Sequence, residues 1–550
     1  MIELELSELN IVLSVVGAFL IVFGIISHKI KKSWYLGEAL PAMLMGVILG
    51  PKAAKFIEPA RWISAEPDEL NELTLGVCRV AIGVQLVIVG FQLPAKYQLL
   101  RWKEKLIGTL PVMTIMWLAT ALCIFAIIPN LTMVRDPKTQ PSLKRHANPL
   151  PPQLSSLVIG ACLACTDPIL SQAIAKGAFA EEHIPRHLRD MMTSEAGAND
   201  SFSFPSLMLA TFLIRHADKG TGEQDAEIER TDTIPEALKA WVLETLLYTI
   251  LMGIVYGAVV GYASCMALKV AVRRRWIDIE SLFLFPTAIG LFIVGTAGAI
   301  DTEELLACFA AGNALNWNGL YQEACKEEHD AVNPTIGFLL NLGAFLYIGS
   351  IIPWDMFSAP AVTYGRLFAL GAAVLLVRRI PATMLSYKML PNECANPREA
   401  LVLGYMGPIG TVGIGAIYLA ERTRKHFPNL GEGDVEESNL ISALTPIVFF
   451  VVLFSIVIHG LSVPVIDFIY RRWVVSKYQK DDKNNILPFS ETSTLNDDKG
   501  DVEKRESIAI FEEVDLKHYS WEAKTSSPLP DHDKRSLDVS DVRYEVKEWV

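Results

Sequence analysis

The sequence predicts an all-α polytopic membrane protein with about 13 transmembrane helices arranged as inverted repeats, two of them broken, followed by a disordered C-terminal tail. Three observations predict this class. The 550 residues are 51% hydrophobic, with a mean hydropathy of +0.31. Their apolar residues gather in blocks of about 20, the length of a membrane-spanning helix, and do not follow a 3.6-residue period. Two blocks are interrupted by Pro or Gly at matching places, as in membrane proteins built from inverted repeats.

The predicted spans are the apolar blocks between flanking charges. They cover residues 9–27, 36–54, 73–94, 106–128, 153–175, 190–214, 238–268, 279–299, 303–317, 335–353, 363–387, 399–420 and 440–468. We group them into one transmembrane domain, residues 1–476. The first block has no basic segment before it and no small-residue cleavage site, so we expect a retained span and not a signal peptide.

Positive charge in short loops predicts the orientation in the membrane. Basic clusters follow the first, third, seventh and last spans, which lie on one side if the number of spans is odd. They comprise Lys29, Lys31 and Lys32; Lys96, Arg101, Lys103 and Lys105; Lys269, Arg273, Arg274 and Arg275; and Arg471, Arg472 and Lys477. We expect the N-terminus outside and the C-terminus in the cytoplasm, although the basic loop 129–152 and the acidic loop 321–332 fit this orientation poorly.

The composition changes at about Lys477 to alternating charges with Ser, Asn and Pro, and the apolar content falls too low for a core. We expect residues 477–550 to form a disordered cytoplasmic tail. One island, residues 506–521, is compatible with a short helix that folds on a partner or on the protein itself. A few hydrophobic residues in a flexible tail would explain it equally well.

Three polar residues stand inside the sixth span, in the run SEAGANDSFSFP: Glu195, Asn199 and Asp200. Ionisable groups at that depth cost at least about 2.5–3.5 kcal/mol each on insertion scales, so chains that retain them usually use them to bind ions or protons. The fifth span carries a further carboxylate, Asp167. Pro168 follows it and cannot continue a regular hydrogen-bonded helix.

The fifth and twelfth spans contain the two predicted breaks. Thr166, Asp167 and Pro168 interrupt the fifth, and the run LGYMGPIGTVGIGA around Pro408 interrupts the twelfth. If spans 1–6 and 8–13 are the repeats, both breaks occupy the fifth place. Broken helices expose carbonyl groups and helix-dipole ends in mid-membrane, which can coordinate a cation and stabilise a nearby carboxylate. Close helix packing would explain the Gly-rich run equally well.

Asp200 has the chemistry of an exchanging group. Desolvation raises the pKa of a carboxyl group, whereas a bound cation favours its ionised form, so a proton and a cation compete for one site. Such competition produces antiport if the site opens alternately to the two sides and the empty ionised form seldom crosses. The alternative role of Asp200 is a buried ion pair or a hydrogen bond within the helix.

Glu195 needs a partner, because an uncompensated buried charge is costly. Arg378 and Arg379 in the eleventh span are the candidates, and we favour Arg379, which leaves Asp200 free to exchange ions. The alternative is that both arginines extend to the cytoplasmic membrane interface.

Acidic residues also open the ninth span on the outer side: Asp301, Glu303 and Glu304. The last two could form a cation-attracting vestibule, or simply occupy a solvated helix N-terminus, where acidic residues are favoured in any case. Arg79 and Gln85 in the third span could support the site, but we assign no role to either.

At these residues the chain resembles the fungal plasma-membrane alkali-cation/proton antiporters and, more distantly, the bacterial NhaP-type exchangers, over about residues 9–475. ACTDPILSQ resembles the family's Thr-Asp-Pro break, and SEAGAND resembles its Glu-x-x-x-Asn-Asp signature. LLACFAAGNALNW and the Gly-Pro-Ile-Gly run add support.

The resemblance implies a 13-helix fold with a dimerisation domain and a six-helix ion-carrying domain that alternates like an elevator. It implies that Asp200 carries the cation, with Asp167 and Thr166 shaping the sodium or lithium site, Asn199 supporting it, and Glu195 paired with an arginine such as Arg379. It further implies a homodimer in the plasma membrane that exports sodium, lithium and often potassium in exchange for protons.

Five residues depart from the family pattern. Ala196 replaces a hydroxyl residue common after the glutamate in NhaP-type members, and Ala164 replaces a Thr usual in fungal relatives. Animal and bacterial members commonly have an arginine inside the Gly-rich motif of the twelfth span, whereas this chain has Pro408 there. Glu303 and Glu304 replace an Asp-Asp pair at the start of the ninth span. Because of these departures, cation selectivity does not follow from the resemblance.

Two other classes of protein compete with an antiporter. An intramembrane aspartyl protease could use Asp167 and Asp200 as a dyad that shares one proton, but the Gly-x-Gly-Asp segment expected of it is absent. A channel, or an anion or organic-solute symporter, could use the same inverted-repeat scaffold. No GxxxxGK[ST] motif occurs, so we expect no nucleotide-driven transport. We also expect no enzymatic activity, no cofactor and no nucleic-acid partner.

Overall fold

The structure is a computed structural model, which describes residues 7–33, 37–62, 67–128, 152–166, 185–217, 234–358, 362–390, 394, 396–406, 414–425 and 435–470. All of them belong to one unit, Met1–Lys477. The predicted tail, residues 477–550, lies outside the described residues. Every regular element in the described ranges is a helix.

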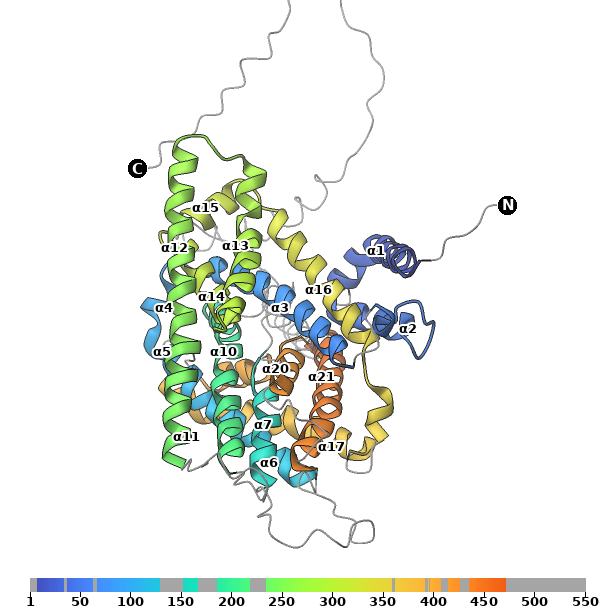
Figure 1. Ribbon diagram of the computed structural model, residues 1–550. Coiled ribbons are helices and arrows are strands. Elements are labelled where there is room, and N and C mark those ends of the chain that lie inside the picture. The colour runs from blue at the N-terminus through green and yellow to red at the C-terminus, as the bar shows by residue number, and fades with distance from the viewer. Residues whose placement is uncertain are drawn as a thin grey trace, which may run out of the picture. The chain divides into compact units, whose positions relative to one another are not determined.

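The helices follow one another along the chain (Figure 1). They are α1 (Glu8–Ser33), α2 (Ala39–Leu49), α3 (Pro67–Gln92), α4 (Tyr97–Leu100), α5 (Trp102–Ile107), α6 (Met113–Ile127), α7 (Pro152–Ala164), α10 (Arg186–Ala217), α11 (Ile234–Ala240), α12 (Met252–Arg273), α13 (Ile279–Ala299), α14 (Glu304–Leu315), α15 (Leu320–Glu327), α16 (Val332–Ser350), α17 (Tyr364–Val377), α18 (Ile380–Ser386), α19 (Pro397–Met406), α20 (Ile414–Lys425) and α21 (Val435–Tyr470). Two π-helical stretches, η2 (Gly108–Val112) and η3 (Trp241–Leu251), join α5 to α6 and α11 to α12.

The predicted all-α membrane architecture is confirmed. Each of the 13 predicted spans contains at least one helix of the described chain. Eight helices in these residues are long and apolar enough to cross a membrane, and three shorter apolar helices accompany them, at Ala39–Leu49, Leu154–Ala164 and Glu304–Leu315. The sixth predicted span, α10, is long enough at 32 residues but carries the polar residues that set it apart.

The helix packing separates two groups of helices. In the first, which we name the α14 group, α14 packs against α3, α12 and α13, and α16 packs against α2 and α3. In the second, which we name the α7 group, α7 packs against α6, α10, α20 and α21, and α17–α19 complete the group through α6, α10 and α21. The groups meet where α10 packs against α14 and α20 against α3. Figure 1 shows α12, α13 and α14 together, away from α6, α7 and α21.

Close approach of backbones holds the α14 group together. Gly257 and Gly261 of α12 lie so near the carbonyls of Ala307 and Ala311 in α14 that a Cβ at either glycine would overlap them. Membrane helices associate through such small-residue contacts, because lipid offers little hydrophobic driving force between helices. The α12–α14 packing therefore depends on these glycines.

The helix breaks bear on the site. α7 ends at Ala164, two residues before the non-helical Thr166, and α19 ends at Met406, eight residues before α20 begins. Asp167, Pro168 and Pro408 lie outside the described residues. A third interruption, which the sequence analysis did not predict, separates α17 from α18 at Arg378 and Arg379. Pro381 follows at the start of α18, where it deprives the Val377 carbonyl of its regular helical donor.

Candidate ion site

Helix α10 carries the signature residues through the middle of the bundle. Glu195 and Asn199 are four residues apart, so they lie on one face of the helix, and Asp200 is the next residue. The backbone of all three is helical; the side chains of Asn199 and Asp200 lie outside the described part of the chain. Pro205 has no N–H, so the Ser201 carbonyl, one residue after Asp200, lacks its regular helical donor. α10 therefore concentrates polar groups beside Asp200.

Glu195 is buried and contacts Arg379 at two points. The Arg379 Nη2 donates to Glu195 Oε2 at 2.8 Å, and Nη1 lies 2.7 Å from Oε1. The guanidinium Nε also donates to the Leu403 carbonyl of α19 at 3.0 Å. The contact expected between Glu195 and Arg379 is thus present, and it joins α10, α18 and α19. The positive charge of Arg379 compensates the negative charge of Glu195, as a buried carboxylate requires.

Arg378 is 1% exposed and turns toward α7. Its Nη1 donates to the carbonyls of Leu163, Ala164 and Cys165, at 3.1, 3.1 and 2.9 Å. The last carbonyls of a helix have no intrahelical donor and carry partial negative charge, so a guanidinium stabilises them. Arg378 therefore occupies the end of α7 immediately before Thr166. With Arg379 also buried, neither arginine extends to a membrane interface, in contrast to the alternative considered above.

Glu303 and Glu304 open α14, but they do not form the exposed vestibule suggested by the sequence. Glu303 is 0% exposed and Glu304 5%. Arg422 Nη1 of α20 donates to Glu303 Oε2 at 2.7 Å, and Arg79 Nε of α3 lies 2.8 Å from Glu304 Oε1. The carboxylates are therefore neutralised within the protein, and neither presents a free charge to solvent.

Tyr418 completes this cluster, which we name the Arg422 cluster: Arg79, Glu303, Glu304, Tyr418 and Arg422. The Tyr418 hydroxyl donates to Glu304 Oε1 at 3.1 Å and accepts from Arg422 Nη1 at 2.7 Å. Because Tyr418 and Arg422 are on α20 and the glutamates on α14, the cluster crosses between the two helix groups.

Sequence reasoning missed Arg422 and Tyr418. The predicted twelfth span ended at residue 420, which placed Arg422 in a solvated flank. The available signal was the spacing of four residues, which puts a tyrosine and an arginine on one face of α20.

Two contacts along α10 locate the Asn199–Asp200 backbone. At Gly197, α10 meets Phe309 of α14, and a Cβ at Gly197 would overlap the ring. Seven residues later, the Arg422 guanidinium lies 4.0 Å from the centre of the Phe204 ring. Asp200 stands between these two levels, with the Arg422 cluster on one side.

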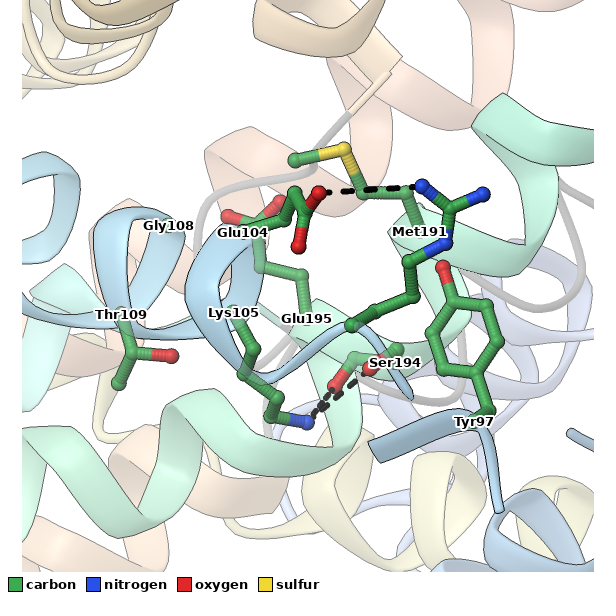
Figure 2. Close-up of a pocket in the computed structure, with 9 residues that line it drawn as sticks. Tyr97, Glu104, Lys105, Gly108, Thr109, Met191, Ser194 and Glu195 are labelled. Atoms are coloured by element: carbon green, nitrogen blue, oxygen red, sulfur yellow. Dashed lines mark hydrogen bonds and ion pairs between the residues drawn. The ribbon is translucent and has the colours of Figure 1, made fainter. Parts of the chain in front are cut away.

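A pocket opens next to Glu195, on the Gly197 side of Asp200 along α10 (Figure 2). It is formed by the segment from α4 to η2 and by the first half of α10, and Ser194 and Glu195 line it. Lys105 Nζ donates to the Ser194 carbonyl and contacts the Ser194 hydroxyl, both at 3.0 Å. The two ends of the segment from Ser194 to Phe204 therefore differ. The buried Arg422 cluster lies at the Phe204 end, and the pocket lies at the Ser194 end.

Of the residues predicted to touch the ion, Thr166 is buried at the end of α7. α7 packs against α10, so the helix that ends just before Thr166 and the signature helix are neighbours. The cation ligands expected from Asp167, Asn199 and Asp200 stay predictions, because those side chains lie outside the described residues.

The bundle of apolar helices, the end of α7 at Ala164 and the buried Glu195–Arg379 pair are typical of polytopic membrane proteins that move ions. A family model described as "Sodium/hydrogen exchanger, transmembrane" matches residues 15–468, and the chain belongs to this family.

Fungal relatives agree with this assignment. The chain is 32% identical over 478 residues to a Na(+)/H(+) antiporter of Saccharomyces cerevisiae, covering 84% of this chain and 44% of the relative. It is 33% identical to the probable Na(+)/H(+) antiporter C3A11.09 of Schizosaccharomyces pombe, covering 84% and 56%. A second Na(+)/H(+) antiporter of Schizosaccharomyces pombe is 30% identical, with 84% and 91% covered. The chain thus spans about half the length of the first two relatives and most of the third.

The fold has a counterpart among solved structures. The sodium proton antiporter MjNhaP1 of Methanocaldococcus jannaschii superimposes with a TM-score of 0.55, covering 84% of this chain and 97% of that one at 14% identity. The family predicted from the motifs is therefore confirmed, and the chain shares the fold of an NhaP-type exchanger.

Proposed function

We propose that the protein is a secondary antiporter that exports sodium in exchange for protons by alternating access, with Asp200 as the shared cation and proton site. The observation that carries this proposal is the neutralisation of Glu195 by Arg379. It removes one of the two signature carboxylates of α10 from ion exchange and leaves Asp200, beside the break of α7.

The chemistry at Asp200 is competition. An ionised Asp200 binds a cation, and protonation releases it, so each ion excludes the other from one carboxylate. Thr166 and Asp167 supply oxygen ligands at the break, Asn199 supports Asp200, and Arg378 holds the end of α7 in place through three carbonyls. Pro168 and Pro408 maintain the two breaks.

Alternating access requires that the α7 group move relative to the α14 group. In the conformation described, the Arg422 cluster joins the two groups on one side of Asp200, and the pocket beside Glu195 lies on the other. We infer that movement separates Arg422 from Glu303 and Tyr418 from Glu304. The Arg79–Glu304 contact lies within the α14 group and keeps Glu304 compensated throughout.

The finer properties are part of the same proposal. Lithium and potassium are further candidate cations. We place the protein in the plasma membrane as a homodimer, with the N-terminus outside, the C-terminus in the cytoplasm and residues 477–550 as a cytoplasmic tail. In this orientation the Arg422 cluster faces outside and the pocket faces the cytoplasm.

The decisive experiment compares wild type with Asp200→Asn in proteoliposomes. Proton flux driven by sodium, lithium and potassium is measured with the membrane potential clamped and unclamped. Asp200-dependent flux supports antiport, its cation ranking defines selectivity, and its voltage response defines the stoichiometry. Absence of proton flux for all three cations in folded protein would contradict the proposal and favour a channel or a solute symporter.

A further inference from the structure

Lys105 is turned into the protein next to the proposed ion path. It belongs to α5, at the membrane end of a basic cluster, but its ammonium points into the pocket and contacts Ser194 (Figure 2). Gln98 holds the same Ser194 hydroxyl at 3.0 Å, and the Phe309 ring of α14 lies 4.8 Å from the Lys105 Nζ. These contacts fix the ammonium in one place.

The other charged residues around the pocket offset one another and do not offset the ammonium of Lys105. Arg101 and Glu104 line the same pocket and lie 3.8 Å apart, so they offset each other. The carboxylate of Glu195 is offset by Arg379. The hydrogen bonds of Lys105 go to neutral oxygens of Ser194. In its protonated form, Lys105 therefore leaves one positive charge at the wall of the pocket formed by α10.

This charge lies close to the exchanging residue along the helix. Ser194 precedes Asp200 by six residues, which is about 9 Å along an α-helix. The carbonyl groups of a helix point toward its C-terminal end, so an ammonium bound to the Ser194 carbonyl lies on the Asp200 side of that residue. At such distances in a partly desolvated site, two unit charges interact strongly enough to change an affinity several-fold.

We propose that Lys105 is a specificity-determining residue for the exchange: its ammonium, fixed on Ser194, weakens cation binding at the site reached from the pocket. The inference rests on the proposed antiport. In that reaction Lys105 sets the cation concentration on the pocket side at which exchange becomes half-maximal. The antiporter then works little at low internal sodium and accelerates when sodium accumulates.

The test measures sodium-driven proton flux in proteoliposomes for wild type, Lys105→Gln and Lys105→Arg. Lys103→Gln is the matched control, since Lys103 carries the same charge two residues away and lies beside the Trp102 ring, outside the pocket. We expect Lys105→Gln to lower the KM for sodium about threefold to tenfold with little change in maximal rate. Lys105→Arg and Lys103→Gln should keep the wild-type KM.

A binding measurement tests the same inference in variants that fold but transport too slowly for a KM to be determined. The sodium concentration that gives half-maximal thermal stabilisation of the detergent-solubilised protein should fall by the same factor in Lys105→Gln. An unchanged KM and midpoint in Lys105→Gln, or an equal change in Lys103→Gln, would overturn the inference while wild-type flux still upheld antiport. If the wild type itself moved no protons, the proposed function would fail instead.

Discussion

Arg379 and Arg422 each neutralise a buried glutamate, but the two pairs connect the molecule differently. Arg379 contacts Glu195 at two points and adds a bond to the Leu403 carbonyl, all within the α7 group. Arg422 reaches Glu303 through one nitrogen, across to the α14 group. Glu303 Oε1 is buried and has no hydrogen-bond partner in the part of the chain that the structure describes.

This difference separates a permanent contact from a breakable one. The Arg379–Glu195 pair combines one hydrogen bond, a second ion-pair contact and the bond to the Leu403 carbonyl, which suits a contact kept through the whole proposed cycle. A one-point contact with an unsatisfied oxygen is easier to exchange for water or another partner. We infer that the first pair maintains the architecture of the ion site, whereas the second is remade in each transport cycle.

The largest expected effect comes from breaking the Glu195–Arg379 pair. Glu195→Gln or Arg379→Gln alone leaves an uncompensated buried charge and should destabilise the protein by about 3–5 kcal/mol. The double variant should lose less than the sum of the two. Melting curves of the four solubilised proteins measure the coupling, and additive losses would show that the two side chains do not depend on each other.

A similar or smaller loss of stability and a larger kinetic effect should follow from breaking the Arg422–Glu303 pair. Arg422→Gln removes two charged hydrogen bonds and the charge that compensates the buried Glu303, so it should cost about 3 kcal/mol or more. It should also speed backbone hydrogen–deuterium exchange in both α20 and the start of α14, because the two groups are held together less tightly.

Arg79→Gln is the matched control for that variant, since Arg79 pairs with Glu304 inside the α14 group. It should reduce stability without faster exchange in α20. Equal exchange in α20 for both variants would remove the distinction between a contact within a group and one across groups.

The smallest effect should be at Asp278, which precedes α13 outside the membrane spans. A hydrogen bond from the Ser281 side chain holds the pKa of Asp278 below its usual range, and the Ser281 N–H, which donates to Oδ1 at 2.9 Å, lowers that pKa further. A carboxyl group with a depressed pKa stabilises the fold above its ordinary pKa and loses that contribution as pH falls through the lower value.

Hydrogen–deuterium exchange in the first turn of α13 checks this prediction. Exchange should be faster in Asp278→Ala than in wild type at neutral pH, and the difference should vanish in acid. Asp278→Asn keeps a capping oxygen without a titrating charge, so its cap should not respond to pH. A pH-independent difference between wild type and Asp278→Ala would mean that the charge of the cap is irrelevant.

The sequence predicted what depends on local composition. Apolar block length located every span, whereas the break at Pro168 stays a prediction beyond the end of α7 at Ala164. The Glu195–Arg379 contact followed from the need to compensate a buried charge, given few basic residues in the spans. Each of these rests on a cost that acts wherever the residue lies in the fold.

The sequence did not reveal what depends on which helix faces approach one another. Arg422 and Glu303 are 119 residues apart, and no periodicity pairs them. Arg378 pairs with carbonyl groups, which every residue carries, so its partner could not be read from side chains. The acidic start of α14 has the same sequence whether it faces water or two arginines, and only the packing of α3 and α20 distinguishes the two.

The adjacency of Arg378 and Arg379 has a mechanical consequence. The Arg378 guanidinium donates to carbonyls at the end of α7, and the Arg379 guanidinium contacts α10 and α19. Both side chains extend from the same joint between α17 and α18. In the proposed antiport, a displacement of that joint would move the end of α7, α10 and α19 together. An ion bound between α7 and α10 would then cross without being released on the way, which would keep the carrier from conducting like a channel.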